Sequence, residues 1–263
     1  MAVGLVVCVV GSDDYRGNPR RLFLPGFGHI LAGMTLLKIA ARIFLVLILL
    51  FILYKLWIFA QIGWWRWFNP STSAFMDARI AVMREKNPDA RLRHQWVPYE
   101  RISVHLKRAV IASEDARFLA HEGFDWEAIE KALEKNLERG KVVAGGSTIS
   151  QQLAKNLFLS SERSALRKIQ EALITVMLEA VLTKRRIFEI YLNLIEWGDG
   201  VFGAQAAAMH YFKVDAMQVN AWQAARLAAM MPSPRYYDKN RNTPFLDRRT
   251  ATILARMRAA DVP

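Results

Sequence analysis

Two neighbouring carboxylates, Glu114 and Asp115, stand before an aromatic residue and a histidine near the middle of the chain. If residues 109–121 form a helix, Glu114, Phe118 and His121 share one face. An acid beside an aromatic ring and an imidazole can serve as a general base, with Asp115 as a supporting hydrogen-bond acceptor. A surface glutamate with a packed histidine would give the same pattern, so the segment alone does not establish catalysis.

A polar segment follows two glycines, Gly145 and Gly146, whose backbone freedom suits a sharp entry into a helix. We expect Ser147 to cap that helix. Four polar side chains are then expected on the side opposite its apolar stripe: Thr148, Gln151, Gln152 and Lys155. Such an amide-rich face suits sugar hydroxyls and a phosphate, although for this segment alone contact with plain solvent is the better explanation.

A third segment brings two bases close to an acid. Arg167 and Lys168 precede Glu171 by four and three residues, so ion pairs within one helix are the simplest explanation. The alternative is a cationic cluster that neutralises a leaving pyrophosphate, with Glu171 as a second carboxylate. That cluster would contain Lys155, Arg163, Arg167 and Lys168. A fourth segment, residues 184–193, is interpreted as a structural helix.

Helices must hold these residues, because apolar side chains recur at spacings of three and four from Trp96 onward. We find no alternating strands of useful length and no internal repeat. The sequence therefore predicts one mainly α domain over residues 96–263. The turn-rich residues 69–95 are expected to form a linker or small membrane-proximal lobe.

An apolar run over residues 43–60, with only Lys55 charged, has nearly the length that a bilayer core requires. Basic residues precede this run and tryptophans follow it, so we expect a cytoplasmic tail over 1–38 and an anchor over 39–68. Lys55 should reach toward the outer interface. A cleaved signal peptide and a buried core helix are the alternatives. Because Met34 is an equally good start, translation of residues 1–33 stays open.

Composition narrows the class of protein. The chain has 263 residues, a net charge of +12, 53% hydrophobic residues and one cysteine, Cys8. One cysteine excludes a disulfide scaffold and a multi-cysteine metal module. Since no nucleic-acid-reading motif is found, nucleic acid is not expected as a partner. An anionic membrane surface or a pyrophosphate-bearing lipid accounts better for the positive charge, part of which is a solvated surface.

In this order the four segments resemble the peptidoglycan glycosyltransferases of glycosyltransferase family 51, particularly the monofunctional biosynthetic transglycosylases. The resemblance covers residues 96–234. Its patterns are E-D-x-x-F-x-x-H-x-G at 114–123, G-G-S-T-I-[ST]-Q-Q at 145–152, R-K-x-x-E at 167–171 and K-x-x-I-x-E-x-Y-L-N at 184–193. Ser150 and Phe188 depart from the commoner Thr and Leu, which affects packing more than chemistry.

The resemblance implies a lysozyme-like helical fold with a small membrane-proximal jaw lobe, and polymerisation of lipid II by inverting glycosyl transfer. The donor is a glycan linked to a polyprenyl pyrophosphate, and the acceptor is the 4-hydroxyl of lipid II. Glu114 is implied as the general base, and Glu171 as the carboxylate that assists departure of the pyrophosphate. A divalent cation, Mg or Mn, could help but is not obligatory. The implied substrate-binding residues are Asp115, Ser147, Gln151, Gln152, Lys155, Arg163, Arg167 and Lys168.

The resemblance also implies a single-pass protein of the bacterial inner membrane, with a periplasmic catalytic domain and proteins of cell-wall synthesis or division as further partners. No transpeptidase activity is expected, since no Ser-x-x-Lys or Lys-Thr-Gly pattern is found. We expect Glu114 and Lys155 to face each other across one groove. The alternatives are a lysozyme-like lytic glycosidase, which would need an acid and a base across the bond, and a membrane-anchored scaffold.

Overall fold

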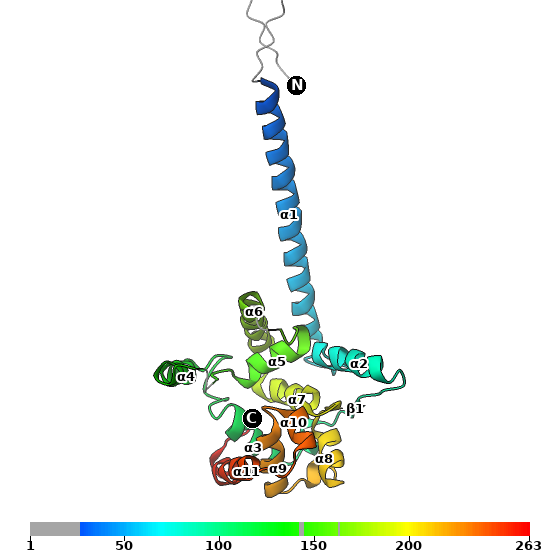
Figure 1. Ribbon diagram of the computed structural model, residues 1–263, viewed down its shortest axis with the longest axis vertical. Helices are drawn as coiled ribbons and strands as arrows, with labels where there is room; N and C mark the ends of the chain where they lie inside the picture. Colours follow the sequence, from blue (N-terminus) through cyan, green and yellow to red (C-terminus); the bar gives the residue numbers. More distant parts are fainter. Residues whose placement is uncertain (1–26, 142–144, 163) are drawn as a thin grey trace, which may run out of the picture. The chain divides into compact units, whose positions relative to one another are not determined.

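The computed structural model describes residues 27–141, 145–162 and 164–263, with side chains described from Leu36 onward (Figure 1). Its contacts divide the chain into two units, which meet between Tyr54 and Lys55. Cys8, the basic residues of the tail before residue 27 and Arg163 lie outside the described residues. The question of the translation start at Met34 also concerns residues that lie mostly outside them.

The first unit, up to Tyr54, consists of most of helix α1 (Phe27–Trp64) in its described part. Residues Leu36–Trp64 are long and apolar enough to cross a membrane, with a mean hydropathy of 2.8, and none of this apolar stretch up to Tyr54 is buried. The predicted apolar helix is therefore confirmed. A row of large apolar side chains exposed to water would be unfavourable, which agrees with a lipid environment.

The last turns of α1 belong to the second unit. Ile58 and Ile62 are fully buried in the hydrophobic core of that unit. Lys55 is only 7% exposed, and that its side chain is able to reach the outer interface stays a prediction. The structure thus divides the chain inside the segment 39–68 that the sequence assigns to the anchor.

The second unit is mainly helical, as the sequence predicts. Its helices are α2 (Ala74–Lys86), α3 (Val104–Glu114), α4 (Trp126–Arg139), α5 (Ile149–Phe158), α6 (Ala165–Val181), α7 (Lys184–Leu194), α8 (Ala204–Phe212), α9 (Ala221–Met230), α10 (Pro234–Lys239) and α11 (Pro244–Arg256). Short 3-10 turns lie at Tyr99–Arg101, Ala216–Gln218 and Met257–Ala259.

A small sheet connects residues 69–95 with the rest of this unit. Strands β1 (Arg93–His94), β3 (Val201–Phe202) and β2 (Glu196–Gly198) lie in that order, with β1 parallel and β2 antiparallel to β3. Arg93 is opposite Val201, so a segment expected as a linker or small lobe pairs with the centre of the domain.

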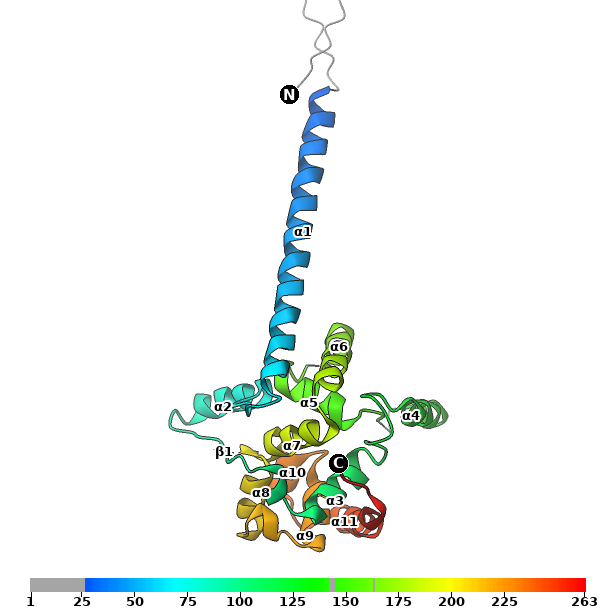
Figure 2. The same cartoon turned by 180° about the vertical axis from the view of Figure 1, so that it is seen from behind.

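Helix α7 lies in the middle of the second unit. In both views α5 and α6 lie on one side of α7, and α3, α9 and α11 lie on the other (Figure 2). Ile187, Phe188 and Tyr191 are fully buried because their spacing places them on one face of the helix. The predicted inward packing of residues 184–193 is confirmed. The facing ends of α3 and α5 carry the candidate site.

Candidate active site

Glu114 is the last residue of α3, because the backbone leaves the helical conformation at Asp115, with φ −163° and ψ 75°. The predicted helix over 109–121 is therefore wrong beyond Glu114. Phe118 turns into the core with 1% of its surface exposed, and His121 contacts Asp115 and not Glu114. The side chain of Glu114 is 13% exposed at the end of the helix.

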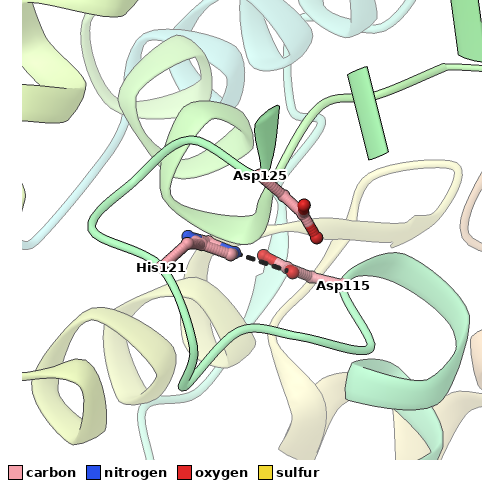
Figure 3. Close-up of side chains that lie close together, drawn as sticks. All are labelled: Asp115, His121 and Asp125. Carbon is pink, nitrogen blue, oxygen red and sulfur yellow. Dashed lines mark hydrogen bonds and ion pairs between the residues drawn. The ribbon is translucent and has the colours of Figure 1, made fainter. Parts of the chain in front are cut away.

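Asp115 joins the end of α3 to the start of α5. Its Oδ2 accepts the Ile149 backbone N–H at 2.9 Å, and its Oδ1 accepts the His121 Nε2–H at 3.0 Å (Figure 3). A carboxylate at the first turn of a helix also interacts favourably with the helix dipole. Asp115 is thus a hydrogen-bond acceptor for the protein itself, as predicted, and its side chain is only 2% exposed.

Thr148, and not Ser147, caps α5, so the expected cap is wrong by one residue. Thr148 Oγ1 accepts the Gln151 N–H at 3.2 Å, and Gln151 Oε1 accepts the Thr148 N–H at 3.0 Å. This capping box uses the Gln151 side chain, which is 3% exposed. Ser147 remains exposed. The predicted polar face therefore splits, since Thr148 and Gln151 serve the helix entry.

Gln152 lies next to the carboxylate of Glu114. Its Nε2 donates to Glu114 Oε2 at 3.1 Å, while Tyr191 donates its hydroxyl to Gln152 Oε1 at 2.9 Å. The tyrosine fixes which end of the amide faces Glu114. Burial raises the pKa of Tyr191, and the nearby charges of Glu114 and Asp115 raise it further, so the hydroxyl stays a donor.

Sequence reasoning missed Tyr191, because residues 184–193 were interpreted as structural only. A signal was available in its residue type. Tyr191 stands on the buried stripe of a helix, and a buried tyrosine hydroxyl usually finds a hydrogen-bond partner.

Two cavities are lined by residues of the candidate site. One, of about 410 Å³, is lined by Gln152, Lys155 and Tyr191 and also by residues 231–236. The second, of about 250 Å³, is lined by Glu114 together with Asp115, Asp125 and residues 145–148. Glu114 and Lys155 therefore do not line one groove, and the expectation that they would is wrong. Glu114 lines one cavity, and its hydrogen-bond partner Gln152 lines the other together with Lys155.

Lys155 is a partly buried cation. No carboxylate lies within ion-pair distance of its Nζ in the part of the chain that the structure describes, and its nearest aromatic contact is the Phe75 ring, 5.7 Å from Nζ to the centroid. Burial lowers the pKa of Lys155, although the charges of Glu171 and Glu114 raise it. Lys155 thus feels both candidate carboxylates without being neutralised by direct contact.

Glu171 of α6 is almost fully buried, with 3% of its surface exposed. Arg167 Nη1 donates to its Oε2 at 2.6 Å, and Lys168 Nζ donates to its Oε1. The ion pairs within one helix are therefore present. Lys155 lies within electrostatic reach of all three groups. Glu171 is not among the residues that line either of the two cavities.

One group of side chains in the described ranges has the spacing of a metal site. The ligand atoms of Asp115, His121 and Asp125 lie within 4.8 Å of one another (Figure 3). Each already has a partner, since Asp125 Oδ1 caps α4 by accepting the Ala128 N–H at 3.0 Å. A cation there would displace the hydrogen bond between His121 and Asp115. The hydrogen bonds of these three residues therefore account for the group as a structural contact.

Exposed apolar side chains gather on two helices of the second unit. Helix α4 has no buried residue, and much of α6 faces outward. The large exposed residues are Trp126, Leu133 and Leu137 on α4 and Leu166, Ile169, Leu173 and Val176 on α6. The cations beside Glu171 share α6 with this apolar surface, an arrangement that suits contact with lipid tails and anionic headgroups.

Fold and site together define a mainly helical enzyme domain preceded by an apolar helix, with an acid and a lysine on two sides of a fixed amide. The chain belongs to the transglycosylase family, whose model, described as Transglycosylase, matches residues 80–258. The resemblance of the four segments is thereby confirmed.

Similar proteins carry the name biosynthetic peptidoglycan transglycosylase. The one from Nitrosospira multiformis is 62% identical over 222 residues, which cover 84% of this chain and 96% of the relative. The one from Laribacter hongkongensis is 63% identical over 228 residues, with 87% and 100% covered. The one from Methylobacillus flagellatus is 63% identical over 219 residues, with 83% and 96% covered.

Proposed function

We propose that this chain is a peptidoglycan glycosyltransferase that polymerises lipid II into linear glycan strands for the bacterial cell wall. The observation that carries the proposal is the hydrogen bond from Gln152, which lines one cavity with Lys155, to Glu114, which lines a second cavity. A reaction between a sugar hydroxyl and a sugar pyrophosphate needs a base at one end and a cation at the other.

Glu114 is the general base of this proposal. It takes the proton from the 4-hydroxyl of the acceptor while that oxygen forms a bond to the anomeric carbon of the donor. The bond from that carbon to the pyrophosphate breaks on the opposite side, and its electron pair leaves with the pyrophosphate. A displacement in one step inverts an α-linkage to a β-linkage, and it depends on holding both sugars in line.

Cations stabilise the leaving group. Lys155 is suited to this because no acid among the residues described pairs with it, so its charge is available to a pyrophosphate. Glu171 holds Arg167 and Lys168, and it assists departure through these two cations. Arg163, which lies outside the described residues, is proposed as a further cation on the basis of the family resemblance alone. A divalent cation, Mg or Mn, is an optional helper and not an obligatory part.

Of the remaining residues, two contact the sugars and two hold the start of α5 in place. Ser147 is exposed and lines the cavity of Glu114, so it contacts a sugar directly. Gln152 contacts the sugars between the two cavities. Asp115 and Gln151 act through the helix entry that they hold in place.

The membrane is the second partner. An apolar helix of membrane-spanning length and the exposed apolar residues of α4 and α6 confine the enzyme to the surface where lipid-linked substrates diffuse. We place the chain in the inner membrane with its N-terminus in the cytoplasm and its catalytic domain in the periplasm. Proteins of cell-wall synthesis or division are proposed as further partners.

A lytic glycosidase is the competing enzyme. Hydrolysis needs a second carboxylate about 5 to 10 Å from the first, free to act across the glycosidic bond. Both oxygens of Glu171 are taken by cations and both oxygens of Asp115 by the protein. The arrangement therefore favours synthesis.

Replacement of the base tests the function. The full-length Glu114→Gln variant, reconstituted in vesicles with labelled lipid II, should polymerise at least about 100-fold more slowly than the unchanged chain, since general bases contribute that much or more. Gln keeps the shape of the side chain but cannot take the proton.

Glu122→Gln is the matched control, because Glu122 is exposed in the same loop region and lines neither cavity. Its rate should equal that of the unchanged chain. Full activity of Glu114→Gln would contradict the proposed base and would favour a scaffold that recruits another enzyme.

A further inference from the structure

Glu114 occupies an unfavourable place for a carboxylate. It is the last residue of α3, where the partial negative charge of the helix end repels an anion. The last turn of α3 contains no basic residue. The charge of Glu114 must therefore be balanced by side chains from other elements.

Arg249 of helix α11 supplies such a side chain. Its Nη2 donates to Ser113 Oγ at 3.2 Å, and Ser113 Oγ donates to Glu114 Oε1 at 3.0 Å. The same Nη2 lies 3.9 Å from Oε1. The serine hydroxyl has one hydrogen and a second acceptor, the Ala228 carbonyl oxygen at 3.4 Å, but the Glu114 carboxylate is nearer and charged and is therefore the stronger acceptor.

The other charged groups around Glu114 do not balance its negative charge in the way that Arg249 does. Lys155 acts from beyond Gln152, and Arg117, in the wall of the same cavity, is paired with Glu127. The neighbouring Asp115 is a further anion, although it is bonded within the protein. In the described chain Arg249 is the one cation within 4 Å of the Glu114 carboxylate.

Arg249 has no competing acid. Glu114 is its one ion-pair partner among the residues described, and its Nε is buried with no hydrogen-bond partner there. The Arg249 side chain as a whole is 32% exposed, but a buried Nε–H without a partner still costs free energy. An orientation that leaves Nε unpaired while Nη2 faces Ser113 and Glu114 is poorly explained by folding alone.

We propose that Arg249 is a positioning residue for the general base, which it serves through Ser113. The pair balances the charge of the carboxylate and fixes Oε1, while Gln152 fixes Oε2. Each oxygen keeps a second lone pair for the acceptor hydroxyl. This inference rests on the proposed function, because it assigns Arg249 to the reaction in which Glu114 takes a proton.

Steady-state polymerisation of lipid II by the full chain in vesicles tests the proposal. Arg249→Ala should lower kcat by about 10- to 100-fold, the effect of a lost hydrogen bond to a charged group, with KM nearly unchanged. Guanidinium ion added to the assay should restore part of kcat. Arg249→Lys should recover only part, because an ammonium lacks the planar fork. Arg248→Ala, on the exposed side of α11, should leave kcat unchanged.

If Arg249→Ala folds poorly, the Ser113→Ala variant tests the same contact. It should lower kcat by about 10-fold, and the double variant should be no slower than Arg249→Ala alone, because both residues act through one contact. A kcat within twofold for Arg249→Ala or Ser113→Ala, with Glu114→Gln inactive, would overturn the inference and leave the proposed function standing. An active Glu114→Gln would instead overturn the proposed function.

Discussion

At the scale of single residues, the site depends on Lys155, a partly buried lysine for which the described part of the chain offers no ion-pair partner. Burial lowers the pKa of Lys155 in the folded chain below its ordinary value of 10.5, whereas the unfolded chain keeps that value. Charged Lys155 therefore destabilises the folded state at every pH below its lowered pKa. The destabilisation disappears as the pH rises through that pKa toward 10.5.

Lys155→Met should consequently separate activity from stability. We expect polymerisation to fall by about 100-fold, comparable to the loss of other electrostatic contacts to a leaving group. The melting temperature at pH 7 should stay equal or rise, because the buried charge is gone. Thermal unfolding and the lipid II assay measure the two effects.

Lys141→Met is the matched control, since Lys141 is exposed beyond α4. It should change neither quantity. A loss of stability in proportion to the loss of activity would mean that Lys155 is a structural residue. Another cation would then have to stabilise the leaving pyrophosphate.

At the scale of elements, the sequence predicted the helices well and their ends less well. The four motif segments lie in or beside the expected helices, because apolar spacing is a local property. The cap of α5 could also have been predicted from the sequence. A capping box needs Glu or Gln three residues after the cap, which Thr148 has in Gln151, whereas Ser147 is followed there by Ser150. Helix α3, however, ends at Glu114, because the next residue, Asp115, leaves the helical conformation and accepts the N–H of Ile149, far along the chain. No local pattern contains that contact.

The same distinction applies to the candidate site. Glu114, Gln152 and Lys155 could be selected by residue type and motif. Arg249 could not, and the residue type of Tyr191 indicates only that it has some partner, because the roles of both depend on which helices pack beside Glu114 and Gln152. Contacts between distant segments are fixed by the fold as a whole.

Replacement of Asp115 tests whether its contact between α3 and α5 stabilises the fold. Asp115→Ala removes the acceptor for two buried donors, the Ile149 N–H and His121 Nε2. We expect a loss of about 2 kcal/mol in the free energy of unfolding, together with a lower polymerisation rate. Denaturant unfolding measures the first, with Glu114→Gln as the control that keeps normal stability. An Asp115→Ala variant of normal stability but no activity would mean that Asp115 binds substrate directly.

At the scale of the whole molecule, two apolar features would bring the enzyme to its substrates. One is the apolar helix, whose residues up to Tyr54 are exposed, and the other is the apolar surface of α4 and α6. Hydropathy alone predicted the helix. It could not show that Ile58 and Ile62 are buried in the core of the catalytic unit, because apolar residues for lipid and for protein look alike.

The nature of the product tests the central claim most directly. The full chain, reconstituted in vesicles with labelled lipid II, should consume the lipid, release polyprenyl pyrophosphate and form a linear β-linked glycan. Electrophoresis separates this polymer from monomer, and digestion by a muramidase identifies its linkage. Preformed glycan added in parallel should remain intact. Cleavage of that glycan into short fragments, with no polymer formed from lipid II, would contradict a synthetic enzyme.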